Sequence, residues 1–269
     1  MNKFKTVLCT LTFLFTAAIF NCIQAQDTLG IKNIVLVHGA FVDGSGWQSV
    51  HDILTDQGYK VIVTQHSLTT FNGDVEAVKR ILDQQSGSCI LVGHSYGGAI
   101  ISEVGNHPNV MGLVYIAAHV PDDGESRADI VKKYPPAYKL LIKGKDGWDY
   151  IDPKLFPADF AADLPKQKAE FMANSQTPTA DEVFQAIIYN VAWKTKPSWY
   201  MVATSDRIIN PDLERMYAER AKSATVEIEG ASHAVFISHP KEVANLIIAA
   251  AKESTASILN RSMNGISLQ

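Results

Sequence analysis

The chain has 269 residues, of which 46% are apolar, and a formal net charge of −4. This length and composition suffice for one sizeable core or two small ones. The mild acidity and the lack of any block of basic residues argue against a nucleic-acid-binding surface. No internal repeat or low-complexity tract is visible.

The first 25 residues predict a secretory signal peptide. Lys3 and Lys5 precede the uncharged apolar run VLCTLTFLFTAAIF, and the segment closes at Ala25, where we expect cleavage. The run is short for a membrane span, although an uncleaved N-terminal anchor remains the alternative. Residues 1–25 therefore predict an exported protein, periplasmic or secreted. Cys89 would be its sole cysteine after cleavage, so no internal disulfide is expected, and we interpret Cys89 as a small core residue.

Beyond the signal segment, apolar β-branched runs alternate with amphipathic stretches. The runs are NIVLVH (33–38), YKVIVTQ (59–65), SCILVG (88–93), VMGLVYIAA (110–118), SWYMVAT (198–204) and ATVEIE (224–229). The amphipathic stretches cover 47–58, 74–85, 96–107, 212–223 and 241–254. Near-continuous apolar runs joined by helix-length connections predict parallel strands buried on both faces, hence an α/β fold.

The alternation breaks once, over residues 119–196. This segment has no comparable apolar run but holds many prolines and aromatic residues. So long a connection is better interpreted as a small helical cap inserted on the sheet than as a structureless loop, with most aromatics forming its own core and a few facing a pocket. The prediction is one domain over residues 26–254 that includes this cap, followed by a flexible tail at 255–269.

A serine surrounded by glycines is the first candidate catalytic residue. Gly93-His-Ser95-Tyr-Gly97 matches the pattern G-x-S-x-G and lies between a predicted strand and a predicted helix, where a nucleophile elbow must lie. The sharp turn forces Ser95 into a strained conformation, and glycines two residues to either side leave room for it. Gly98 would let the following helix pack close to the sheet. An ordinary glycine-serine turn is the alternative.

A serine hydroxyl needs a base, and the base needs a group that orients it. For this elbow the chain order is serine, acid, histidine. Asp206 follows the run SWYMVAT and His233 follows ATVEIE, so both lie on loops at the carboxyl ends of predicted parallel strands, as Ser95 does. Ligands bind at that edge of such sheets. Asp122 and Asp123, which follow the run at 110–118, are the rival acids, and we favour Asp206.

The remaining histidines are weaker candidates for the base. We expect the side chain of His94 to point away from the elbow and to act as support. His119 lies close enough to line the pocket, but no acid is placed to orient it. The others are expected to be solvated, packed or near a helix start: His51, His66, His107 and His239.

An oxyanion formed at Ser95 would need two hydrogen-bond donors. The backbone N–H of Tyr96 is one candidate. The loop His38-Gly39-Ala40-Phe41 after the first apolar run supplies the other, with Ala40 as first choice and Phe41 as second. An ordinary glycine-rich loop is the alternative. Residues near these positions are predicted to line the substrate pocket: His38, Gly39, Phe41, Trp47 and His119.

Four segments together carry a family resemblance: LVHGAFVDGSGW, LVGHSYGGAI, ATSDRIINP and EGASHAVFISHP. They resemble the α/β-hydrolase superfamily, and more narrowly small bacterial serine hydrolases near the plant methylesterase and hydroxynitrile lyase group. The resemblance covers most of residues 32–252 and is weakest in the cap. It implies an α/β-hydrolase fold of about six to eight strands, with the cap after the sixth strand of the full fold, no metal and no organic cofactor. The chain would begin at the third strand of that fold.

Two positions narrow the activity that the resemblance implies. Ser95 stands where epoxide hydrolases and haloalkane dehalogenases have aspartate. Ala234 stands where hydroxynitrile lyases have lysine after the histidine, which argues against lyase activity. The prediction is an esterase that cleaves a small or medium ester or lactone through an acyl-enzyme. An amidase, a C–C or C–N bond hydrolase, a cofactor-free perhydrolase and a non-catalytic ligand receptor stay open as alternatives.

Overall fold

The computed structural model describes residues 30–138 and 141–266, with side chains to residue 260. The predicted signal peptide at 1–25 lies outside the described residues. Six strands form the central sheet in the order β2-β1-β3-β4-β8-β9, and every neighbouring pair is parallel. These strands are β1 (Asn33–Val37), β2 (Lys60–Val63), β3 (Cys89–His94), β4 (Val110–Ile116), β8 (Ser198–Ala203) and β9 (Ala224–Ile228). All six coincide with predicted runs, and the predicted α/β-hydrolase architecture is confirmed.

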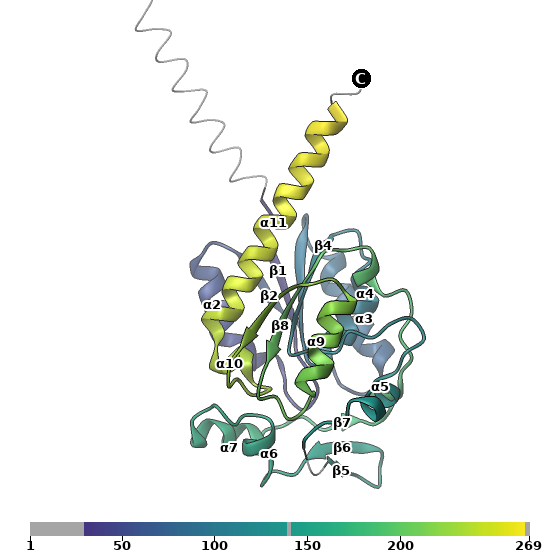
Figure 1. Ribbon diagram of the computed structural model, residues 1–269, viewed down its shortest axis with the longest axis vertical. Coiled ribbons are helices and arrows are strands. Elements are labelled where there is room, and N and C mark those ends of the chain that lie inside the picture. Colours follow the sequence, from purple (N-terminus) through teal and green to yellow (C-terminus); the bar gives the residue numbers. More distant parts are fainter. Residues whose placement is uncertain (1–29, 139–140, 267–269) are drawn as a thin grey trace, which may run out of the picture.

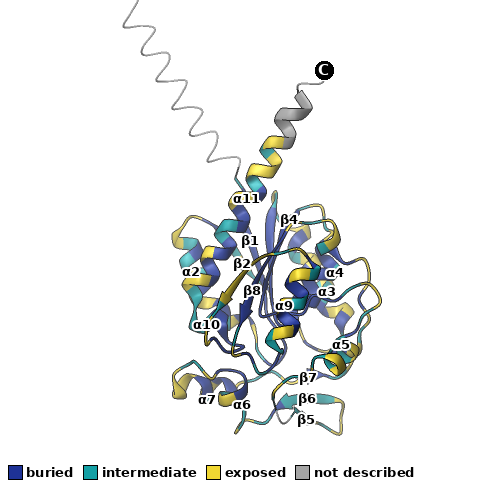
Figure 2. Ribbon diagram, viewed as in Figure 1, coloured by how far each residue is buried: buried dark blue, intermediate teal, exposed yellow. Residues whose placement is uncertain are grey.

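Burial explains why the central strands have continuous apolar sequences. Every residue of β1, β3 and β8 is buried, whereas the edge strand β9 is mostly exposed (Figure 2). Cys89 opens β3 as a free, fully buried thiol, as predicted. Burial raises the pKa of Cys89 to about 12, so the thiol stays protonated at neutral pH.

Helices cover both faces of the sheet (Figure 1). On one face, α2 (Gln48–Asp56), α10 (Val235–Ser238) and α11 (Pro240–Ile266) enclose an apolar core with strand residues such as Ile34 and Ile90. On the other, α3 (Phe71–Asp83), α4 (Gly97–Val104) and α9 (Pro211–Arg220) enclose a second core with Val35 and Leu91. Alternate residues of one strand thus supply opposite cores, as the period-2 geometry of strands requires.

The C-terminal helix differs from the prediction. The predicted helix ends near residue 254 and is followed by a separate tail at 255–269, but α11 continues to Ile266. Thr255 takes part in a contact with the start of the described chain, since the N–H of Ile31 donates to Thr255 Oγ1 at 3.0 Å. Among the described residues, no helix has both the length and the hydropathy needed to cross a membrane.

The segment 119–196 forms a cap over the carboxyl edge of the sheet (Figure 1). The prediction of a helical cap is wrong in part, because the cap also contains strands. It holds short helices and a three-stranded antiparallel sheet in the order β5-β6-β7. Its elements are α5 (Arg127–Lys133), β5 (Leu141–Lys143), β6 (Trp148–Ile151), α6 (Phe156–Asp159), α7 (Lys166–Asn174), β7 (Thr179–Ala180), α8 (Glu182–Gln185) and a 3-10 helix (Ala192–Lys194). Strands this short carry too few residues to display an alternating pattern.

Candidate active site

Ser95 occupies a sharp turn between β3 and α4. Its φ is +52°, a left-handed conformation that is costly for a residue with a Cβ. A Cβ on Gly93 would lie 2.6 Å from the carbonyl oxygen of Gly97, and one on Gly97 would lie 2.6 Å from that of His38. Only glycine fits at these two positions. Gly98 has a related role, because its Cβ would lie 2.4 Å from the carbonyl oxygen of His119, in the loop after β4.

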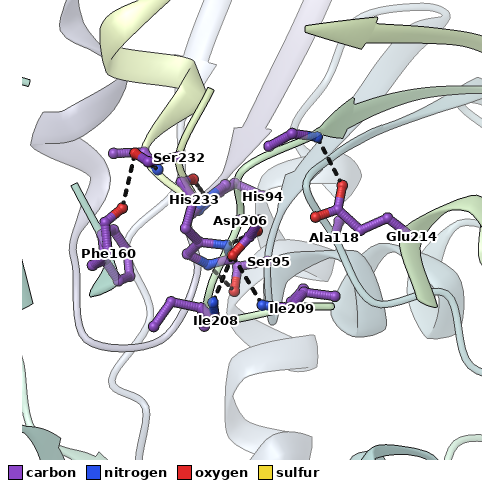
Figure 3. A network of polar contacts seen from close by, with 12 residues as sticks. His94, Ser95, Ala118, Phe160, Asp206, Ile208, Ile209, Glu214, Ser232 and His233 are labelled. Carbon is purple, nitrogen blue, oxygen red and sulfur yellow. Dashed lines mark hydrogen bonds and ion pairs between the residues drawn. The ribbon is translucent and has the colours of Figure 1, made fainter. Parts of the chain in front are cut away.

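Three predicted side chains meet at this turn in one hydrogen-bonded chain (Figure 3). His233 Nδ1 lies 2.5 Å from Asp206 Oδ2, and His233 Nε2 lies 2.8 Å from Ser95 Oγ. A carboxylate can only accept, so Nδ1–H donates to Asp206. In the neutral imidazole, Nε2 is then free to accept the hydroxyl proton of Ser95. The order of serine, base and orienting acid is the one that activates a serine nucleophile.

The backbone holds the acid of this chain of hydrogen bonds in place. The second oxygen of Asp206, Oδ1, accepts hydrogen bonds from the N–H groups of Ile208 at 2.7 Å and Ile209 at 3.0 Å (Figure 3). Two backbone donors fix the orientation of a carboxylate. They hold Asp206 so that its Oδ2 faces His233 Nδ1.

His233 itself is positioned by its neighbours in space. Its carbonyl oxygen accepts a hydrogen bond from His94 Nε2 at 2.9 Å, so His94 acts as support, as predicted. The preceding residue, Ser232, has its Oγ 2.5 Å from Asp163 Oδ1 in the cap. The ring of Phe160, also from the cap, meets the His233 ring edge-on with centroids 4.7 Å apart. Core and cap thus both constrain the histidine.

The other histidines around the site are poor proton acceptors. Burial lowers the pKa of His94 well below its ordinary value, and the neighbouring His233 lowers it further. Burial also lowers the pKa of His119 well below the usual range, and the nearby Arg127 and His233 lower it further. Among the described residues, Ser95 Oγ contacts no histidine nitrogen but that of His233. An imidazole with so low a pKa does not take up a proton readily at neutral pH, so it is a weak general base.

The rival acids Asp122 and Asp123 are engaged elsewhere. Both carboxylates pair with Lys194, at 2.5 and 2.7 Å. Burial raises the pKa of Asp122, but the hydrogen bond to Lys194 and further contacts outweigh burial, so this pKa is lowered. The hydrogen bond to Lys194 likewise lowers the pKa of Asp123. Neither carboxylate is hydrogen-bonded to His233, which leaves Asp206 as the acid in contact with it.

The loop after β1 discriminates between the two candidate oxyanion donors. The N–H of Phe41 already donates to Thr179 Oγ1 of the cap at 3.2 Å. In the described part of the chain, neither the N–H of Ala40 nor that of Tyr96 has a hydrogen-bond partner. Gly39 brings this loop against the elbow, because a Cβ there would lie 2.7 Å from Ser95 Cβ. The geometry favours Ala40 and Tyr96 over Phe41 as the available pair.

The predicted pocket residues divide into different environments. His119 lines a narrow enclosed cavity between the cap and α4, together with Tyr96 and Tyr217. His38 is buried and stacks face to face on His66, with ring centroids 3.6 Å apart. Neither ring lines the cavity that contains His119. Phe41 borders a separate shallow cleft against α7.

The prediction for Trp47 is wrong. Its side chain is fully buried in the core beneath α2 and α11, with its ring 4.8 Å from that of Phe236. It meets His94 edge-on at 6.4 Å. Trp47 therefore supports the elbow from below the sheet and does not line a cavity.

Two buried acids of the site escaped sequence analysis. Asp74 at the start of α3 accepts hydrogen bonds from the hydroxyl of Tyr96 at 3.0 Å and from the N–H of Leu68 at 3.0 Å. The first of these bonds holds the side chain of Tyr96, the residue after Ser95. Glu214 in α9 is fully buried near Asp206 and accepts from the N–H of Ala203 at 3.0 Å. An acid at a core position of an amphipathic helix was the available signal in both cases, since charged residues are rarely buried without a specific partner.

Comparison with known proteins gives the class of the chain. Residues 34–246 match the model of the alpha/beta hydrolase family, so the chain belongs to that family. The Carbendazim hydrolyzing esterase of a Nocardioides species is 32% identical over 129 residues, an alignment that covers 42% of this chain and 53% of that esterase. The Pyrethroid hydrolase of Sphingobium wenxiniae is 27% identical and aligns over 81% of this chain and 86% of its own length.

The predicted likeness to plant methylesterases is also found among solved structures. A methylesterase from Arabidopsis superimposes with a TM-score of 0.69 at 17% identity, covering 82% of this chain and 99% of the plant protein. At that identity the likeness shows the fold alone. The cap and the six parallel strands described above are thus a variation on a known hydrolase architecture.

Proposed function

We propose that the protein is a serine hydrolase that cleaves carboxylic esters through an acyl-enzyme. The observation that carries the proposal is the continuous hydrogen-bonded chain from Ser95 Oγ through His233 to Asp206. The relatives named as esterases and hydrolases support the same reaction class. The largely apolar wall of the cavity beside Tyr96 suits the apolar part of an ester or lactone, which we infer to be small or medium in size.

The reaction would run in two halves. Ser95 Oγ bonds to the acyl carbon while its proton passes to His233 Nε2, and Asp206 stabilises the imidazolium. The N–H groups of Ala40 and Tyr96 donate to the oxyanion of the tetrahedral intermediate. His233 then gives its proton to the leaving alkoxide, which departs as an alcohol. A water molecule, deprotonated by His233, attacks the acyl-enzyme and releases the carboxylic acid and free Ser95.

The first test is hydrolysis of a short-chain p-nitrophenyl ester and covalent labelling by a fluorophosphonate. We expect Ser95→Ala to abolish labelling and to lower kcat by at least about a thousandfold, since removal of the nucleophile disables the whole unit. Ser205→Ala is the matched control, because this hydroxyl is exposed one residue from Asp206 and makes no side-chain hydrogen bond in the described chain. A wild-type protein that neither turns over the ester nor reacts with the fluorophosphonate would overturn the proposal.

The second test addresses the acid. Asp206→Asn should lower kcat by about 10³- to 10⁴-fold, because an amide at this place favours the wrong tautomer of His233. Wild-type turnover in this variant would mean that another group orients the histidine. The alternative of a ligand receptor predicts tight binding of an ester without turnover, which the same assay excludes or supports.

A further inference from the structure

Arg127 begins cap helix α5 and is held at one side of the candidate active site. The chain before it is anchored to the end of the cap, since the N–H of Gly124 donates to the carbonyl of Ile188 at 2.9 Å and the N–H of Ile188 donates to that of Glu125 at 3.1 Å. The guanidinium carbon lies 4.6 Å from the centroid of the Phe184 ring, a distance typical of a cation–π contact. The cation is thus fixed in place by the cap.

The guanidinium of Arg127 has no carboxylate partner among the described residues. Every acid in the surrounding segment 122–129 pairs with another cation. The pairs are Asp122 and Asp123 with Lys194, Glu125 with Arg220, and Asp129 with Lys132. Among the described residues its guanidinium makes one hydrogen bond, to the Tyr138 hydroxyl at 3.4 Å, which is long for such a bond. Arg127 therefore differs from Lys132, Lys194 and Arg220, each of which is paired with a carboxylate.

Arg127 contributes to the lining of the cavity that contains His119. Tyr96 and Tyr217 line the same cavity, and the rest of its wall is largely apolar, with residues such as Val183. Two of its lining residues flank the candidate nucleophile, because Tyr96 follows Ser95 in the chain and the N–H of His119 donates to the carbonyl of Ser95 at 3.1 Å. No acidic residue contributes to the lining. A cation with no matching anion thus faces an apolar space next to the serine.

We propose that Arg127 binds the free carboxylate of substrates that are half-esters of dicarboxylic acids. The inference rests on the proposed ester hydrolysis and names its substrate class. A guanidinium offers parallel N–H donors that match the two oxygens of a carboxylate, and partial burial strengthens that pair relative to water. The hydroxyls of Tyr96 and Tyr217 already have partners in Asp74 and His119. Arg127 is the cationic group in this wall with unused donors.

The size of the cavity sets a condition on binding. Its volume is about 20 Å³, room for about one water molecule. A substrate can enter only when the cap residues around Arg127 shift outward from α4. The pair between guanidinium and carboxylate would then connect the cap to the substrate while the ester lies at Ser95.

The test compares monoethyl adipate, which carries one free carboxylate, with its neutral counterpart diethyl adipate. We expect Arg127→Gln to lower kcat/KM for the monoester by about tenfold or more, the usual effect of losing a hydrogen bond between charged groups. The rate for the diester should stay within about threefold. Lys132→Gln is the matched control, because it removes one positive charge from the same helix at a side chain that is 75% exposed. It should leave both rates unchanged.

Two outcomes would overturn the inference. Equal losses for both esters in Arg127→Gln would assign Arg127 a structural role, and unchanged rates would assign it none. Failure of the proposed hydrolysis is distinguishable, since it removes turnover of both esters and fluorophosphonate labelling in the wild type. In that case binding of free adipate to Ser95→Ala, measured by calorimetry, still decides: Arg127→Gln in this background should weaken it by about tenfold, and unchanged binding refutes the site.

Discussion

Glu214 provides a quantitative test of how the candidate acid is surrounded. Its side chain is fully buried in α9, where Oε2 accepts the N–H of Ala203 and Oε1 has no hydrogen-bond partner among the described residues. Burial and then the carboxylate of Asp206 raise the pKa of Glu214 well above its ordinary value. In the described chain no ion pair compensates a negative charge there. The folded protein therefore keeps the proton on Glu214 to a higher pH than an exposed glutamate would.

The sign of the pH dependence follows from this shift. An unfolded glutamate has a pKa of about 4.3, so above that pH the folded state binds one proton more than the unfolded state at this residue. The free energy of unfolding then falls as pH rises, by about 1.4 kcal/mol per unit, until the pH reaches the folded pKa. Glu214→Gln removes the titration but keeps a neutral side chain of similar shape. From pH 5 upward the wild type should thus lose stability relative to the variant at that rate.

The assay is urea unfolding of the wild type and Glu214→Gln at pH 5, 6 and 7. We use the difference between the two proteins at each pH, because the titration of groups that do not interact with Glu214 cancels to first order. Glu219→Gln is the matched control, since this residue lies on the same helix but is exposed. Its difference from the wild type should not change with pH. A constant difference for Glu214→Gln as well would mean that Glu214 is ionised in the folded state, and the reasoning would fail.

Two further substitutions test the turn and the loop that carry the candidate donors. Gly97→Ala should destabilise the fold by about 1–3 kcal/mol or more, because its Cβ would lie 2.6 Å from a backbone oxygen. Thermal unfolding measures this loss. Gly30→Ala is the control, because its Cβ would have its nearest neighbour at 4.0 Å. Thr179→Val should cost about 1–3 kcal/mol in urea unfolding and lower kcat, because the buried N–H of Phe41 loses its acceptor. Thr179→Ser should restore both, and wild-type values in Thr179→Val would show that the contact does not position the loop.

Strand positions were predictable because burial on both faces leaves a strong local signal. A central parallel strand such as β3 must be apolar at every residue, and its sequence shows this directly. The cap strands left no such signal. β7 has two residues and pairs with β6 from across the cap, so its extended conformation depends on the partner strand and not on its own composition.

The members of the candidate triad were predictable for a topological reason. Each follows a recognisable strand, and parallel strands bring their carboxyl ends to one edge, so their convergence requires no knowledge of side-chain contacts. Trp47 shows where this argument stops. It lies near the oxyanion loop in sequence, but the 3-10 turn Gly44–Trp47 directs it under the sheet into the core. Distance along the chain does not determine which side of a layer a residue reaches.

Charge pairing in the cap shows why substrate specificity is the hardest property to derive from sequence. The sequence alone gives no reason to treat Arg127 and Arg220 differently. They differ because α9 packs where Arg220 can reach Glu125, while Arg127 is turned toward the cavity by its contact with Phe184. The tertiary packing of the cap therefore decides which cation keeps unused hydrogen-bond donors, and the cap is the part of the chain with the weakest sequence pattern. The candidate catalytic groups follow strand ends, whereas the group proposed to select the substrate depends on how the cap packs on the sheet.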